Sequence, residues 1–122
     1  MPKPDILVAE DDEVLLSLYE KKFQMQGFSV RKAHDGQQVL DMMREKTPDV
    51  LILDIRMPKI DGLQVLQEFP KHGRKFPIIV LTNFNDDLCE SRARELGADQ
   101  YFVKKDMNMK KLLEIIKSIS IP

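Results

Sequence analysis

The chain has 122 residues, of which 43% are hydrophobic and 32% charged, the proportions of an ordinary globular protein, and we expect residues 1–122 to form one domain. Nineteen basic and twenty acidic side chains give a formal net charge of −1, which argues against direct nucleic-acid binding. A single cysteine, no run of about 20 apolar residues and no signal peptide together predict a cytoplasmic protein that contacts no membrane.

Apolar runs that are too short for helices are the clearest local pattern. Four of them are rich in branched or aromatic residues, which is typical of strands covered on both faces in a parallel sheet. A fifth run is weaker and carries Arg31 and Lys32, which indicates an edge strand. In chain order the predicted strands are Ile6–Ala9, Phe28–Ala33, Val50–Leu53, Ile78–Leu81 and Tyr101–Val103.

Each predicted strand is followed by apolar residues at helical spacing. Asp12 is predicted to cap the first helix, and Asp106 or Asn108 the last. The basic run Lys71–Lys75 is interpreted as a solvated turn. Helix by helix, the positions predicted to face the core are Leu15, Leu18, Tyr19 and Phe23; Val39, Leu40 and Met43; Leu63, Leu66 and Phe69; Leu88, Ala93 and Leu96; and Leu112, Ile115, Ile116 and Ile119.

Five successive strand–helix units favour an α/β fold, a doubly wound, flavodoxin-like (βα)5 arrangement. Its five-stranded parallel sheet is expected to have the strand order 2-1-3-4-5. In such sheets ligands bind beyond the carboxyl ends of the strands, where the strand order reverses. The residues that directly follow each predicted strand are therefore the first candidates for chemistry.

Carboxylates, a hydroxyl and an ammonium follow the predicted strands. Glu10 and Asp11 follow the first strand and Asp54 the third, so the expected order brings three carboxylates into one pocket. Their repulsion is costly unless a cation offsets it, and Mg²⁺ fits better than Ca²⁺ because it accepts few carboxylates and also takes phosphate oxygens. Thr82 and Lys104 would add a hydroxyl and a positive charge for a bound anion. Phosphoryl transfer onto a carboxylate requires these groups.

Four segments at these strand ends carry a resemblance to a known family. They are Ile6–Asp12, Asp54–Pro58 with Asp61-Gly62, Leu81-Thr82 and Gly97–Lys104. Together and in this order they resemble the response-regulator receiver domains of two-component signalling, over nearly the whole chain. The resemblance implies a signalling domain rather than an enzyme, which accepts a phosphoryl group from a sensor histidine kinase or a histidine phosphotransfer protein. Phosphorylation would switch the surface of the fourth helix, fifth strand and fifth helix toward an output domain or protein target.

The resemblance also implies a role for individual residues. Asp54 is similar to the aspartate that accepts the phosphoryl group. Asp11, Asp54 and the backbone carbonyl of Arg56 would be Mg²⁺ ligands, and Glu10 would act through water. The implied switch residues are Thr82, which supplies the hydroxyl, Lys104, which pairs with the phosphoryl group, and Tyr101, the aromatic that changes rotamer.

The sequence departs from the family pattern near the site. Lys105 stands where proline usually follows the lysine, so we expect either a trans bond with a shifted loop or a strained bond, and either would affect Lys104. Asn83 is larger than the residue that the family favours and would restrict access to the acyl phosphate. Arg56 and Phe84 flank the site at positions that tune hydrolysis in this family.

Other functions remain open. The departures at Lys105 and Asn83 motivate a pseudo-receiver, an interaction module without phosphorylation, and Mg²⁺-dependent acceptance of a phosphoryl group separates the two. A haloacid-dehalogenase-type phosphatase is disfavoured because Arg56 stands where its second acid would be. A flavodoxin is disfavoured because the loop after the first strand is acidic and would repel a flavin phosphate.

Overall fold

Parallel strands form one sheet in the computed structural model, which describes residues 3–83 and 86–120. The sheet has the order β2-β1-β3-β4-β5, which confirms the predicted doubly wound, flavodoxin-like arrangement. The strands are β1 (Asp5–Ala9), β2 (Ser29–Ala33), β3 (Val50–Leu53), β4 (Ile78–Thr82) and β5 (Gln100–Val103).

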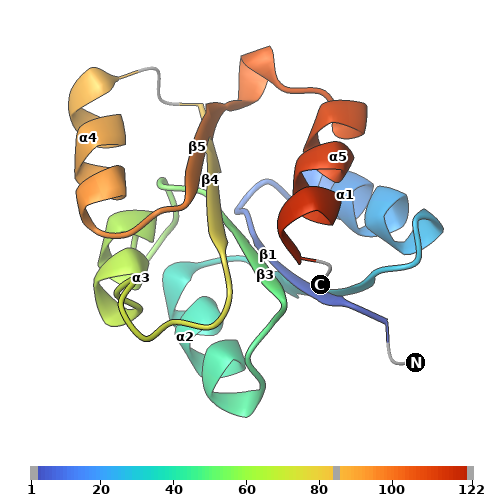
Figure 1. The fold of residues 1–122 in the computed structure, drawn as a ribbon, viewed down its shortest axis with the longest axis horizontal. Helices are drawn as coiled ribbons and strands as arrows, with labels where there is room; N and C mark the ends of the chain where they lie inside the picture. Colours follow the sequence, from blue (N-terminus) through green and yellow to red (C-terminus); the bar gives the residue numbers. More distant parts are fainter. Residues whose placement is uncertain (1–2, 84–85, 121–122) are drawn as a thin grey trace.

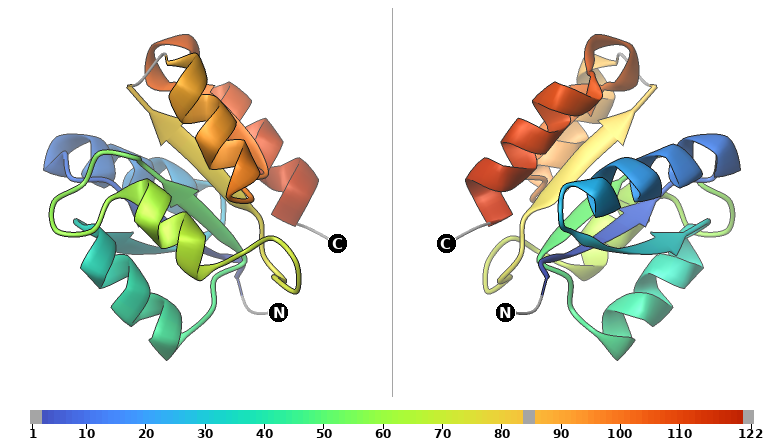
Figure 2. Two further views of the ribbon diagram at one scale, coloured as in Figure 1. Left: turned by 90° about the vertical axis from the view of Figure 1, so that its left-hand side faces the viewer. Right: turned by 90° about the vertical axis from the view of Figure 1, so that its right-hand side faces the viewer.

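Helices cover both faces of this sheet (Figures 1 and 2). The helices α1 and α5 lie on one face, and α2, α3 and α4 lie on the other. None of the helices in the described ranges has the length and apolar content needed to cross a bilayer. Their bounds are α1 (Glu13–Met25), α2 (Gly36–Glu45), α3 (Gly62–Glu68), α4 (Asp87–Glu95) and α5 (Met109–Ser120), and a short 3-10 helix, η1 (Lys104–Asp106), precedes α5.

The sheet separates two hydrophobic clusters because successive side chains of a strand point to opposite faces. In β1, Ile6 and Val8 belong to the cluster under α1 and α5, whereas Leu7 and Ala9 belong to the cluster under α2, α3 and α4. The central strands β1, β3 and β4 are buried along their whole length. This double burial explains why their sequences are continuous apolar runs.

Both outer strands are only partly covered. β2 forms one edge and is exposed at Ser29, as its charged residues predicted. The Tyr101–Val103 run is packed on both faces as predicted, with Tyr101 and Val103 against one cluster and Phe102 against the other, but only Tyr101 is buried because β5 forms the opposite edge of the sheet.

The sequence misassigned one buried position in α1 and one in α4. Leu16 is 1% exposed whereas Leu18 is 42% exposed, because the contact face of α1 is formed by Leu16, Tyr19 and Phe23. Leu88 is 81% exposed. The packed face of α4 is instead formed by Cys89, Ala93 and Leu96, which are spaced four and three residues apart.

Side-chain caps begin the first and last helices. Asp12 caps α1, because its Oδ1 accepts hydrogen bonds from the amides of Val14 (3.0 Å) and Leu15 (3.2 Å). Asn108 rather than Asp106 caps α5, since its Oδ1 accepts from the Lys111 amide at 2.8 Å. These caps fix where each helix leaves the carboxyl edge of the sheet.

Candidate functional site

A cleft of about 770 Å³ opens at the carboxyl edge of the sheet. Its position beyond the ends of β1 and β3 is where a doubly wound sheet binds ligands. Among the described residues, the cleft contains all those that the sequence predicted for the site except Tyr101. The lining residues are Glu10, Asp11, Asp12, Leu15, Asp54, Arg56, Thr82, Asn83, Lys104 and Lys105.

Backbone hydrogen bonds hold the acidic residues at the ends of their strands. The Glu10 amide donates to the Ala33 carbonyl at 3.0 Å, and the Asp54 amide donates to the Ala9 carbonyl at 3.1 Å. The ladder therefore continues one residue beyond β1 and β3. Functional side chains placed on such rigid strand ends are held more firmly than side chains on free loops.

The loop after Asp54 is also held closely against the strand end. The Gly62 amide donates to the Ile55 carbonyl at 2.8 Å, and a β-carbon at Gly62 would overlap the Asp54 carbonyl. Asp61 begins α3 with a capping box in which its side chain and that of Gln64 each accept from the other's amide. The Asp61-Gly62 pair thus lets α3 start directly beside the backbone of Asp54.

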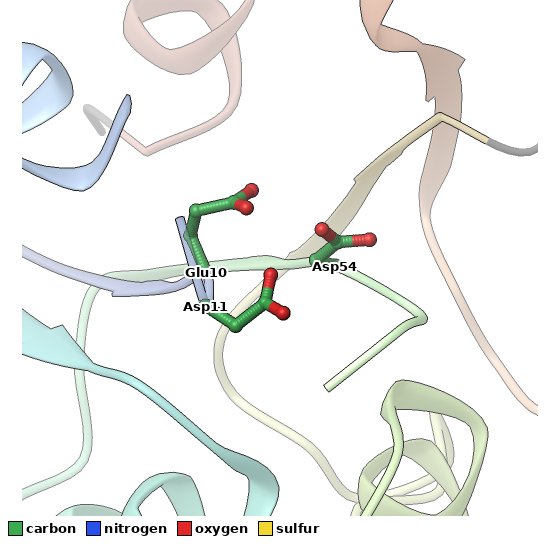
Figure 3. A group of neighbouring side chains, drawn as sticks. All are labelled: Glu10, Asp11 and Asp54. Carbon is green, nitrogen blue, oxygen red and sulfur yellow. The ribbon is translucent and has the colours of Figure 1, made fainter. Parts of the chain in front are cut away.

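Carboxylates of Glu10, Asp11 and Asp54 gather at the floor of the cleft (Figure 3). One oxygen from each lies within 4.8 Å of the others. Glu10 and Asp54 are buried, and Asp11 is exposed. Oxygen ligands from a few carboxylates beside open space fit Mg²⁺, which keeps several of its waters. The arrangement therefore agrees with the expected ligands Asp11 and Asp54, with Glu10 close by.

The Lys104 ammonium lies between two of these carboxylates. Its Nζ is 2.9 Å from Asp54 Oδ2 and also donates a hydrogen bond to Glu10 Oε2. Burial by itself lowers the pKa of Lys104, but the hydrogen bonds to Asp54 and Glu10 and the negative charges of these carboxylates together outweigh burial, and the pKa is raised. Lys104 thus stays charged and partly offsets the repulsion between the two carboxylates.

Glu10 is the acid most affected by this environment. Burial raises its pKa from 4.5 to about 7, although the hydrogen bond from Lys104 acts in the opposite direction, and the nearby charge of Asp54 raises the pKa further. The amide of Asp12 also donates to Glu10 Oε1 at 3.2 Å. Glu10 is therefore a carboxylate whose charge is costly until a further cation is present.

Lys105 does not displace Lys104 from the site. The bond between the two lysines is trans, one of the two outcomes expected for a residue other than proline. The chain then turns through η1, which the Met107 amide closes on the Lys104 carbonyl at 3.1 Å. Lys104 consequently keeps its contact with Asp54, while Lys105 is exposed and also lines the cleft.

Thr82 and Tyr101 occupy neighbouring strands at different depths. Thr82 ends β4, is 1% exposed and lines the cleft. Tyr101 pairs with Val80 in the sheet register and lies inside the cluster under α4. Burial and a side-chain hydrogen bond with Cys89 raise the pKa of the Tyr101 hydroxyl, which keeps it protonated. Tyr101 therefore connects β5 with α4 rather than contacting the cleft.

The structure describes two of the three residues that the sequence predicted to control access to Asp54. Asn83 and Arg56 are exposed and line the cleft, and the Arg56 amide donates to Asp54 Oδ1 at 3.3 Å. Phe84 lies outside the described residues. Leu15 and Lys105 line the cleft although the sequence had not assigned them to it. The available signal was that Leu15 lies in the first turn of the helix capped by Asp12 and that Lys105 directly follows Lys104.

A family model for the response regulator receiver domain matches residues 6–117. The chain belongs to this family. Receiver domains are signalling modules of two-component systems, with histidine kinases as partners, and the family typically uses Mg²⁺.

Individual receiver proteins support the same assignment. The response regulator MprA of Mycobacterium avium is 40% identical over 100 residues, which cover 81% of this chain and 43% of MprA. A DNA-binding response regulator of the LuxR family from Staphylococcus aureus has a TM-score of 0.88 at 27% identity, covering 96% of this chain and 98% of that one. The BeF3-activated DrrB receiver domain has a TM-score of 0.84 at 28% identity, covering 95% and 96%.

The receiver matches only part of its longer relatives. The chain spans 43% of the length of MprA and 41% of the alkaline phosphatase synthesis regulator PhoP of Bacillus subtilis. The comparison therefore concerns the receiver part of those proteins.

Proposed function

We propose that this chain is a phosphorylatable receiver in which Asp54 accepts a phosphoryl group from a phosphohistidine donor in a Mg²⁺-dependent reaction. One observation carries the proposal. Asp54 lies at the floor of an open cleft, with Glu10 and Asp11 oxygens within 4.8 Å and the Lys104 ammonium at 2.9 Å. This geometry supports the proposal because phosphoryl transfer would require a nucleophilic carboxylate, acidic metal ligands and a phosphate-pairing cation at one point.

The transfer exchanges one bond to phosphorus for another. An Asp54 carboxylate oxygen attacks the phosphorus, the bond between phosphorus and the donor's imidazole nitrogen breaks, and the imidazole leaves with a proton from solvent. Asp11, Asp54 and the Arg56 carbonyl would hold Mg²⁺, with Glu10 acting through water. When bound, Mg²⁺ would neutralise charge on the phosphoryl oxygens. Lys104 would exchange its contact with Asp54 for a phosphoryl oxygen and offset the remaining charge.

The switch in this proposal runs from Thr82 to α4. A phosphoryl group on Asp54 adds a charge near −2, and the Thr82 hydroxyl at the end of β4 would donate to it. Tyr101 on the adjacent strand shares its packing with Cys89 of α4, so a shift at the end of β4 would change the rotamer of Tyr101 and the position of α4. The α4–β5–α5 surface would then favour an output domain or protein target.

We assign docking of the donor to α1. Val14 is 82% exposed and Leu18 42% exposed, and Leu15 on the same helix lines the cleft. A sensor histidine kinase or phosphotransfer protein that delivers its phosphohistidine to Asp54 would cover these apolar residues. We further propose that residues 1–122 act as one receiver domain in the cytoplasm, in line with the single cysteine.

Intact-mass measurement after incubation with a small phosphodonor, with and without Mg²⁺, tests the proposal. We expect a Mg²⁺-dependent gain of one phosphoryl group in the wild type and none in Asp54→Ala, with both proteins shown to be folded. Rapid quenching over a time course excludes loss by fast hydrolysis. A folded wild type that binds Mg²⁺ but gains no phosphoryl group at any time would instead support a pseudo-receiver.

A further inference from the structure

Two consecutive lysines line the cleft at different depths. The Lys104 side chain is 12% exposed and lies at the floor against Asp54 and Glu10. Lys105 is exposed and belongs to the rim of the same cleft. The η1 turn, closed by the hydrogen bond from Met107 to Lys104, fixes the second lysine there. The backbone thus presents one ammonium to the buried site and one to its entrance.

The charges of the cleft are unevenly compensated. Its lining contains four acidic residues, Glu10, Asp11, Asp12 and Asp54, and three basic ones, Arg56, Lys104 and Lys105, and Lys104 is engaged by two of the acids. Over residues 3–83 and 86–120 no ion pair involves Lys105. Its charge is therefore available to an anion that enters from solvent and must pass an acidic surface to reach Asp54.

We propose that Lys105 is a positioning residue that captures the phosphoryl dianion of an incoming donor and guides it toward Asp54. This inference rests on the proposed phosphorylation of Asp54. Proline at this position would offer no charge at the entrance, so Lys105 adds an electrostatic step to this receiver. An exposed charge acts mainly on the rate of approach, and its effect falls as salt screens it.

The position of Lys105 separates its role from that of Lys104. The buried Lys104 can pair with the phosphoryl group once it is attached to Asp54, because it already contacts that carboxylate. The exposed Lys105 acts before the bond forms. Phosphorylation should therefore depend on Lys105 much more than hydrolysis of the aspartyl phosphate does.

Rates of phosphorylation by acetyl phosphate, a small anionic donor, test this step. We expect Lys105→Gln to lower the apparent second-order rate constant about threefold at low ionic strength, with the difference disappearing at high ionic strength. Lys105→Arg should keep the wild-type rate and salt dependence because it keeps the charge. Lys110→Gln is the matched control, since it removes an exposed lysine of α5 that does not line this cleft.

Two further measurements complete the test. Urea unfolding should give the same midpoint for all four proteins, and hydrolysis of the aspartyl phosphate should change less than about twofold in Lys105→Gln. If the wild type is phosphorylated and Lys105→Gln reacts at the same rate at low salt, the role of Lys105 is overturned while the proposed function stands. A Lys105→Arg variant as slow as Lys105→Gln would have the same meaning. A folded wild type that never becomes phosphorylated would overturn the proposed function and this inference together.

Discussion

At the amino end of the sheet, each of the three nitrogens of the buried Arg74 guanidinium has a hydrogen-bond acceptor. It donates to the carbonyls of Phe69, Phe76 and Gly97 at 2.7–2.8 Å and to Asp99 Oδ2 at 2.5 Å. At the carboxyl end, a single ammonium, that of Lys104, lies between the buried carboxylates of Glu10 and Asp54.

Arg31 and Asp5 form a second group of this kind at the amino end of the sheet, in which each guanidinium nitrogen again has an acceptor. Arg31 donates to Asp5 Oδ2 through two nitrogens, at 2.6 and 3.0 Å, and to the carbonyls of Met42 and Lys46 near the end of α2. The Asp5 amide in turn donates to Asp49 Oδ2 at 2.6 Å. Planar guanidinium groups suit such fixed, multiple contacts with carboxylates and carbonyls.

The two ends of the sheet differ in what their charged residues do: those at the amino end stabilise the fold, whereas those at the carboxyl end form the candidate site. The arginines connect loops and helix ends through hydrogen bonds that are already complete, so any change there removes stability. At the carboxyl end, the buried carboxylates of Glu10 and Asp54 share the flexible Lys104 ammonium, and in the proposed function these contacts are exchanged for those of a metal ion and a phosphoryl group. The four predictions below test this contrast, from the largest expected effect to the smallest.

Arg74→Met should have the largest effect on stability. Its side chain is 3% exposed, and its loss takes a donor from three carbonyls and leaves Asp99 with the Ile78 amide and the exposed Lys71 as partners. We expect the free energy of unfolding in urea to fall by about 3 kcal/mol, with the same response to Mg²⁺ as the wild type. Arg94→Met, which breaks an exposed pair with Glu90, is the control and should cost less than about 0.5 kcal/mol. Equal losses in the two variants would contradict the contrast.

Lys104→Met should destabilise the protein less, and in a way that Mg²⁺ reverses. Without Lys104, Glu10 and Asp54 lose their shared cation, and we expect a loss of about 2 kcal/mol when EDTA is present. Mg²⁺ should recover part of this loss because it binds the folded state preferentially. Urea unfolding with EDTA and with saturating Mg²⁺ measures both quantities. A loss that Mg²⁺ leaves unchanged would argue against a metal site at these carboxylates.

Glu10→Gln should change how stability depends on pH. The pKa of Glu10 is raised from 4.5 to about 7, so between these values the folded state binds more protons than the unfolded state. The Glu10 contribution to the free energy of unfolding therefore decreases as pH rises through this window. In EDTA, the free energy of unfolding of the variant should therefore rise relative to that of the wild type by on the order of 1 kcal/mol from the bottom to the top of this pH window. A difference that stays constant with pH would contradict the raised pKa.

Asn83→Ala should have the smallest effect, on the lifetime of the aspartyl phosphate. Asn83 is exposed and lines the cleft, where we expect its side chain to restrict access to Asp54. We expect the lifetime to change by more than about twofold, or roughly 0.4 kcal/mol in the barrier to hydrolysis. Ser91→Ala, on the exposed side of α4, serves as control. An unchanged lifetime would remove Asn83 from the mechanism.

The same contrast shows which features the sequence revealed. The acids at the carboxyl edge could be predicted because each follows a short apolar run, and parallel strands bring such positions together. The basic run Lys71–Lys75 was interpreted as a solvated turn, yet Arg74 within it is buried. Nothing local predicts that burial, since its acceptors Gly97 and Asp99 lie 23 and 25 residues away in the chain.

Amino-acid order alone therefore determined the alternation of strands and helices, the α1 cap at Asp12 and the set of groups at the strand ends. Each of these follows from local hydrophobicity, spacing and hydrogen-bonding capacity. Tertiary structure decided which of the neighbouring leucines in α1 is buried and that Lys104 contacts Glu10 and Asp54 across 94 and 50 residues of chain. Such outcomes depend on which elements pack together, and local periodicity carries no information about distant partners.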